Sequence, residues 1–299
     1  MADAGGLPAD VERRRLALPE AGVEIALLDW GGEGPLALLH HANGFCAALW
    51  APIAEALRDR FHVVAMDARG HGDSSLPSER PPEEAFAWPV MAADLRAVAL
   101  TLLQETGHSQ IALGLGHSFG GTLTLAAESA HPGLYQRIVM VDPVLRSPED
   151  IGALAGSTAG DLLAERARVR RHVFPSRAEA RAHFAARELF KSWTDRALDL
   201  YVEEGLLERP DGQLALKCPG AVEAAIFEGS GFQGVWEGAS AARAPALFLW
   251  AKRGNFSRAT YEQLAERMPG GVVETLDAGH LVSMEQPQIV VDAVRRFCA

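Results

Sequence analysis

The sequence predicts a doubly wound, mostly parallel α/β sheet of eight strands. Short apolar runs alternate with longer helical patterns, which is typical of a sheet covered by helices on both faces. The alternation stops from about Arg146 to Arg243 and then resumes, which indicates an insertion into the sheet domain. A chain of 299 residues, 48% apolar and 22% charged, is long enough to bury this sheet, and its composition excludes disordered and fibrous classes.

Each predicted element rests on its own pattern. The first two strands form a hairpin around a short turn containing Pro19 and Gly22, and the later strands are short, buried apolar runs. The helices are amphipathic stretches that follow these runs, and one of them starts directly after Ser118. The predicted strands are 11–18, 23–30, 36–40, 61–66, 111–115, 138–141, 246–250 and 272–276, and the predicted helices are 47–58, 90–105, 119–130, 258–267 and 289–297.

The interruption divides the chain into two parts. Residues 1–145 and 244–299 form the predicted core, and residues 146–243 form a helical lid inserted after the sixth strand. The ends of the lid meet because both flanks belong to one sheet. An arginine-rich run at 165–174 lies in the lid. Two interpretations of this run stay open: a solvated helix face and a carboxylate-binding surface.

The string Gly116-His117-Ser118-Phe119-Gly120 is the strongest functional signal. It matches G-x-S-x-G, with an apolar strand before it and a helix after it. Glycines two residues from the serine allow a turn that is too tight for Cβ atoms, and the serine hydroxyl lies at a helix N-terminus, where developing negative charge is stabilised. The sequence therefore predicts that Ser118 is a nucleophile.

Four motifs in order resemble those of α/β-hydrolase fold enzymes, over about residues 23 to 297. They are His41-Ala-Asn-Gly-Phe45, Asp67-Ala-Arg-Gly-His-Gly-Asp-Ser74, the serine turn, and Asp277-Ala-Gly-His280. The resemblance implies an α/β-hydrolase sheet with a lid and a catalytic triad. His280 follows the last strand, at the sheet edge that Ser118 shares, and is the predicted base.

The acid is the member of the triad in which this chain departs from the family pattern. Relatives usually carry an aspartate where this sequence has Gly254 or Asn255. Asp142 ends the strand after the serine helix, 24 residues beyond Ser118, and is the predicted acid. Because Asp-Pro also commonly ends a strand for turn reasons, orientation of His280 by the 254–255 region stays open.

The oxyanion hole and the substrate pocket follow from the same resemblance. Two backbone N–H groups are expected, those of Phe119 and Asn43, with Phe45 as the alternative to Asn43 because Ala42 replaces the usual glycine. Residues assigned to substrate binding are Phe45, His117, Phe232 and Trp236, and a packing role stays open for His117.

Charge and composition limit the other partners. A net charge of −11 argues against nucleic acid and anionic membranes. Cys46, Cys218 and Cys298 have no paired spacing, and no signal peptide or membrane span is expected, which favours a cytoplasmic location. No metal and no cofactor are expected, and a homodimer stays open.

The sequence thus predicts a cofactor-free serine hydrolase that acts on a small or medium carboxylic ester or lactone through an acyl-enzyme. Hydrolysis of a C–C bond and cofactor-free perhydrolysis stay open within the same fold. A catalytically silent receptor for a small ligand is the alternative from another class, because a fold does not determine a function.

Overall fold

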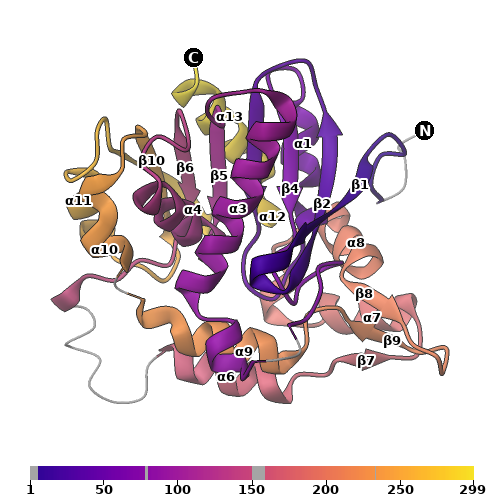
Figure 1. The fold of residues 1–299 in the computed structure, drawn as a ribbon. Coiled ribbons are helices and arrows are strands. Elements are labelled where there is room, and N and C mark those ends of the chain that lie inside the picture. The colour runs from indigo at the N-terminus through magenta and orange to yellow at the C-terminus, as the bar shows by residue number, and fades with distance from the viewer. Residues whose placement is uncertain (1–5, 78–79, 150–158, 233) are drawn as a thin grey trace.

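A mostly parallel sheet runs through the centre of the protein. Its strands are β1 Glu12–Leu18, β2 Val23–Gly31, β3 Leu36–His40, β4 His62–Met66, β5 Leu113–His117, β6 Ile138–Val141, β10 Ala246–Arg253 and β11 Val272–Gly279. They are ordered β1-β2-β4-β3-β5-β6-β10-β11 (Figure 1). β2 pairs antiparallel with both β1 and β4, and the pairings from β4 to β11 are parallel. The computed structural model, which describes residues 6–77, 80–149, 159–232 and 234–299, therefore confirms the predicted sheet.

Helices cover both faces of this sheet. They are α1 Ala51–Leu57, α2 Pro82–Ala85, α3 Trp88–Thr106, α4 Phe119–Ala130, α11 Arg258–Ala265, α12 Val282–Glu285 and α13 Pro287–Phe297. Side chains alternate along β3: Leu39 joins the apolar cluster that contains α1 and α13, and Leu38 joins the cluster that contains α3 and α4. The sheet is therefore buried on both sides. No helix of the described residues is both long and apolar enough to cross a membrane.

Strand β5 begins two residues later than predicted. Ile111 makes only an isolated bridge to Tyr135, and the regular pairing runs from Gly114 opposite Ile138 to His117 opposite Val141. This register carries β5 to the residue directly before Ser118. The serine therefore lies at the edge of the sheet where parallel strands end.

The segment between β6 and β10 contains helices, as predicted, and also a small sheet that was not predicted. Its helices are α6 Ala159–Val169, α7 Arg177–Ala185, α8 Asp195–Glu204, α9 Gly220–Glu228 and α10 Gly234–Gly238, and its strands are β7 Val173–Phe174, β8 Leu206–Glu208 and β9 Leu214–Leu216. β8 and β9 form a hairpin whose turn includes Pro210 and Gly212, with φ of +77° at Gly212. Strands of two or three residues are too short to show an alternating pattern in sequence.

A buried carboxylate fixes the point where the chain returns to the sheet. Glu128, in the last turn of α4, is fully buried. Its Oε1 accepts hydrogen bonds from the backbone N–H groups of Gly133, Arg243 and Ala244 at 2.9, 2.9 and 3.0 Å, and its Oε2 accepts from Tyr135 N at 3.1 Å. One side chain thus joins the end of α4, the approach to β6 and the approach to β10.

We expect Glu128→Gln to lower the free energy of unfolding by about 3 kcal/mol, because an amide NH₂ would face backbone donors that are buried. Urea unfolding followed by circular dichroism measures this difference. The matched change Glu262→Gln, in an exposed pair with Arg258, should cost at most about 0.5 kcal/mol. Equal effects of the two changes would contradict the role of Glu128.

Candidate active site

Ser118 lies in a strained turn between β5 and α4. Its φ of 55° and ψ of −121° are unusual for a residue with a side chain. A Cβ atom on Gly116 would lie 2.4 Å from the Gly120 carbonyl oxygen, and a Cβ atom on Gly120 would lie 2.3 Å from the His40 carbonyl oxygen. Both glycines are therefore required by close backbone packing, and the turn presents the serine hydroxyl at the start of the helix.

The structure brings the three predicted catalytic residues into one chain of hydrogen bonds. His280 Nε2 lies 2.9 Å from Ser118 Oγ, and His280 Nδ1 lies 2.7 Å from Asp142 Oδ2. With the proton on Nδ1, the imidazole donates to the carboxylate and its Nε2 lone pair faces the hydroxyl. The three side chains come from the ends of β5, β6 and β11, which meet at one edge of the sheet.

Asp142 is held firmly for this contact. It is fully buried and has a φ of 40°, the left-handed region, directly after β6. Its Oδ1 accepts a hydrogen bond from the Ala251 amide at 3.0 Å. The Tyr261 hydroxyl lies 3.3 Å from the same oxygen and donates to the neighbouring Pro143 carbonyl at 2.6 Å. Tyr261 was not predicted from the sequence, because nothing in the pattern of α11 distinguishes it from an ordinary core residue.

Gly254 leaves the space that the Asp142 carboxylate occupies. A Cβ atom on Gly254 would lie 2.5 Å from Asp142 Oδ2, whereas the side chain of Asn255 is exposed. The Asp142 carboxylate therefore fits in its place because residue 254 has no side chain. Of the two possibilities that the sequence left open, Asp142 is the one that contacts His280.

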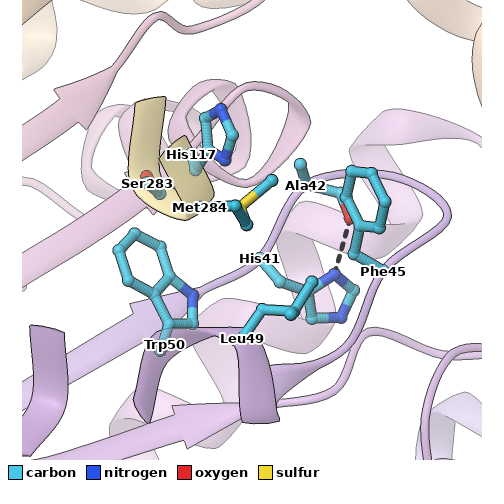
Figure 2. Close-up of a pocket in the computed structure, with 8 residues that line it drawn as sticks. All are labelled: His41, Ala42, Phe45, Leu49, Trp50, His117, Ser283 and Met284. Atoms are coloured by element: carbon cyan, nitrogen blue, oxygen red, sulfur yellow. Dashed lines mark hydrogen bonds between the residues drawn. The ribbon is translucent and has the colours of Figure 1, made fainter. Parts of the chain in front are cut away.

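His117 packs beneath the loop that carries His280. It is buried, and its Nε2–H donates to the backbone carbonyl of His280 at 2.8 Å. Burial lowers the pKa of His117 to about 3, so its imidazole is neutral near pH 7. Together with Phe45 it lines a small, mostly apolar pocket (Figure 2), which also includes His41, Ala42, Leu49, Trp50, Ser283 and Met284. Contact of Phe45 and His117 with substrate stays a prediction.

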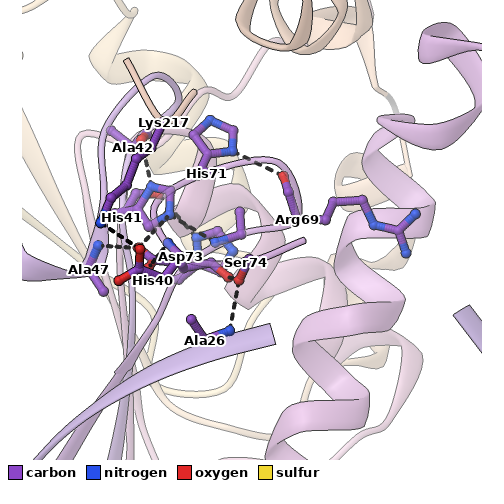
Figure 3. A network of polar contacts seen from close by, with 12 residues as sticks. Ala26, His40, His41, Ala42, Ala47, Arg69, His71, Asp73, Ser74 and Lys217 are labelled. Carbon is purple, nitrogen blue, oxygen red and sulfur yellow. Dashed lines mark hydrogen bonds and ion pairs between the residues drawn. The ribbon is translucent and has the colours of Figure 1, made fainter. Parts of the chain in front are cut away.

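The loop that follows β3 is anchored by two buried neutral histidines. His41 Nδ1–H donates to the Ala42 carbonyl at 2.8 Å, and His41 Nε2 accepts from the Ala68 amide at 2.9 Å (Figure 3). His71 Nε2 accepts from the Gly44 amide at 3.1 Å. Burial lowers the pKa of His71 to about 4 and that of His41 well below its usual value, which keeps these nitrogens available as acceptors.

The same bonds set the direction of the Asn43 amide. The Ala42 carbonyl accepts from His41 and also from the Phe45 amide, at 3.2 Å. In a planar trans peptide the carbonyl and the following N–H point in opposite directions, so Asn43 N–H points away from His41. Within the described residues no acceptor is found for this N–H, whereas the Phe45 amide already closes the turn.

The other two predicted substrate residues, Phe232 and Trp236, lie just before α10 and on α10. Trp236 lies on α10, and the Arg267 guanidinium lies 4.3 Å from the centre of its ring. Gly238 of the same helix packs beside Ser129 in the last turn of α4. Ser118 lies at the opposite end of α4, about 16 Å away along a helix of this length. Phe232 lines a surface groove with the same end of α4 and with α3. Phe232 also packs against Trp88, whose ring contacts Phe119 directly after the serine. Contact of Phe232 and Trp236 with substrate stays a prediction.

Comparisons with known proteins agree with this fold. Residues 35–287 match the family model described as alpha/beta hydrolase fold. Two curated bacterial relatives are the 2-(acetamidomethylene)succinate hydrolase of Mesorhizobium japonicum, 33% identical over 111 residues, and the N-formylmaleamate deformylase of Pseudomonas putida, 34% identical over 128 residues. The matched segments cover 37% and 42% of this chain and only 36% and 44% of those relatives.

A solved structure of an E-2-(acetamidomethylene)succinate hydrolase superposes with a TM-score of 0.79 and 24% identity, covering 96% of this chain and 98% of the other. At this identity the likeness shows the fold alone. Because the family model spans most of the chain, the chain belongs to the alpha/beta hydrolase fold family.

We expect Gly254→Ala to disturb the contact between Asp142 and His280, because the new methyl group would overlap Asp142 Oδ2. The proton NMR resonance of His280 Nδ1–H should shift upfield as the hydrogen bond lengthens. Asn255→Ala, which removes an exposed side chain, is the matched control and should leave the resonance unchanged. An unchanged resonance in Gly254→Ala would contradict the close approach.

Proposed function

We propose that this protein is a serine hydrolase that forms an acyl-enzyme on Ser118. The observation that carries the proposal is the continuous hydrogen-bonded chain from Ser118 Oγ through His280 to Asp142 Oδ2. A serine hydroxyl is a weak nucleophile, and a neutral imidazole within hydrogen-bond reach activates it. A buried carboxylate on the far nitrogen fixes the tautomer and stabilises the imidazolium.

The reaction follows from this geometry. Ser118 Oγ attacks the acyl carbon while its proton moves to His280 Nε2, and the carbonyl electrons move to the oxygen. The tetrahedral intermediate collapses, the bond to the leaving group breaks, and His280 gives the proton to that group. Water, activated by the same histidine, then attacks the acyl-enzyme and releases the acid and Ser118.

Two amides support the developing oxyanion in this proposal. Phe119 is the first residue of α4, so its N–H has no acceptor within the helix. Asn43 N–H points away from His41 and lacks an acceptor among the described residues. Asn43 is therefore preferred to Phe45, whose amide is bonded to Ala42.

A small or medium carboxylic ester or lactone is the proposed substrate class. The substrates for which the two bacterial relatives are named each contain an amide-linked acyl group, which favours including small amides beside esters. A fluoroacetate dehalogenase of Burkholderia is also 32% identical over 112 residues. Dehalogenases of this fold use a carboxylate nucleophile, and Ser118 argues against that chemistry here.

Ser118→Ala should lower turnover of p-nitrophenyl acetate by about 10⁴- to 10⁶-fold and abolish covalent labelling by a fluorophosphonate, because the nucleophile is removed. Mass spectrometry of the labelled wild type should place the adduct on Ser118. A protein that binds small ligands without catalysis would label slowly or not at all, which would overturn the proposal. An adduct on another residue would overturn the assignment of Ser118.

Asp142→Asn should lower kcat by about 10²- to 10⁴-fold with the fold intact, because the imidazolium loses its counter-charge. Steady-state kinetics at saturating ester measures this loss. A wild-type rate in Asp142→Asn would show that another group orients His280.

The acid should also be transferable between strands. In the double variant Asp142→Gly, Gly254→Asp, the Cβ atom of the new aspartate would lie 2.5 Å from the position that Asp142 Oδ2 occupies in the wild type. This variant should be at least about 10-fold faster than Asp142→Gly alone. Asp142→Gly with Asn255→Asp is the matched control and should restore nothing, since position 255 is exposed. Rescue by position 255 instead would contradict this geometry.

A further inference from the structure

The turn at residues 42–45 is held from outside by the segment between β6 and β10. Gly44 has a φ of 81°, and a Cβ atom on it would lie 2.5 Å from Glu223 Oε1. The Glu223 side chain of helix α9 therefore packs in the space that a glycine leaves beside this turn. The contact lies one residue from the amide that we assign to the oxyanion hole.

Two hydrogen bonds join this segment to the peptide units around Asn43. The Tyr201 hydroxyl of α8 donates to the Gly44 carbonyl at 3.2 Å, and Asn43 Nδ2 donates to the Glu223 carbonyl of α9 at 3.0 Å. Tyr201 is 1% exposed, and its ring packs edge-on against Phe45 at 5.5 Å between centroids. Burial raises the pKa of Tyr201, so its hydroxyl stays a neutral donor.

A half-buried ion pair holds the Glu223 carboxylate beside this turn. Arg170 Nε lies 2.9 Å from Glu223 Oε2, and an Arg170 Nη2–H donates to the Cys218 carbonyl at 3.1 Å. The arginine-rich run of the sequence thus has two environments: Arg168 is in an exposed pair with Glu228, whereas Arg170 is turned inward.

We propose that Tyr201 and Glu223 are positioning residues that hold the Asn43–Gly44 turn, so that Asn43 N–H stays aimed at the oxyanion. His41 fixes this amide from the core side, and Tyr201, Arg170 and Glu223 fix the turn from the other side. The inference rests on the proposed function, because it assigns the group that these contacts support. It implies that the inserted segment takes part in transition-state stabilisation.

The test uses the full-length protein and the variant Tyr201→Phe, which removes one hydroxyl and keeps the ring that packs on Phe45. The probe is a fluorophosphonate: the Ser118 Oγ–P bond forms, the P–F bond breaks, fluoride leaves, and the serine proton goes to His280. Negative charge that develops on the phosphoryl oxygen needs the same amides as an acyl oxyanion. Removal of a whole oxyanion donor costs 10²- to 10³-fold, so a displaced donor should slow labelling and kcat for p-nitrophenyl acetate by about 10-fold, with KM nearly unchanged.

Tyr135→Phe is the matched control, since Tyr135 is also 1% exposed and lies just before β6, at the opposite edge of the sheet. It should leave labelling at the wild-type rate. Asn43→Ala is the second variant: it keeps the backbone N–H, removes the side-chain bond to Glu223, and should slow labelling in the same direction. The double variant Tyr201→Phe, Asn43→Ala should label more slowly than either single variant. The total slowing should be less than the product of the two single effects, because both changes act on one turn.

The outcomes separate the two proposals. If wild-type protein is not labelled on Ser118, the proposed function fails and the inference fails with it. If the wild type is labelled and both Tyr201→Phe and Asn43→Ala react at its rate, only the positioning role is overturned. A fall in Tm with an unchanged labelling rate, or equal slowing in Tyr135→Phe, would show that Tyr201 is merely structural and would also overturn the inference.

Discussion

The geometry of the site depends on where one buried carboxylate can be placed. Asp142 leaves β6 with a left-handed backbone, and its Oδ2 lies in the space beside Gly254 at the end of β10. Three neighbouring strand ends are thereby coupled: β6 supplies the acid, β10 supplies the Ala251 amide and the vacant Cβ position, and β11 supplies His280. A fully buried carboxylate must be satisfied by such donors, and the Tyr261 hydroxyl, which donates to the Pro143 carbonyl, packs beside it.

On the other side of Ser118 the constraint is the direction of peptide planes. Backbone amides cannot be exchanged by mutation, so the chain controls them through what binds the neighbouring carbonyl. His41 can hold Ala42 only as a neutral imidazole that donates from one nitrogen and accepts on the other. Asp67 serves the adjoining turn: it accepts from the Ala47 and Asp73 amides at 2.7 and 2.9 Å, and burial raises its pKa to about 6.

Much of this arrangement could be predicted from the sequence, for identifiable reasons. The sheet follows from apolar runs, and Ser118 and His280 follow from local motifs in which a few adjacent residues specify the geometry. Asp142 could be found because a parallel sheet brings strand ends together. At Gly254 the sequence indicates only that the usual aspartate is absent. It does not show that the Asp142 carboxylate occupies the space that a side chain would fill. A substrate contact of Trp236 stays a prediction, since an aromatic residue in an inserted segment carries no signal for the face on which it packs.

Arg170 and Glu223 show why the core and the inserted segment are difficult to separate functionally. Removing two charges from water is costly, and an apolar pair of similar volume would often be at least as stabilising. What an apolar pair lacks is direction: it could not donate to the Cys218 carbonyl and also hold a carboxylate against Gly44. Ion pairs that are more exposed than this one, such as Arg196 with Glu55, can keep the segment near the core but define no peptide plane. The partly desolvated pair therefore lies where orientation matters most, beside the turn that presents Asn43, and the exposed pairs lie where proximity is sufficient.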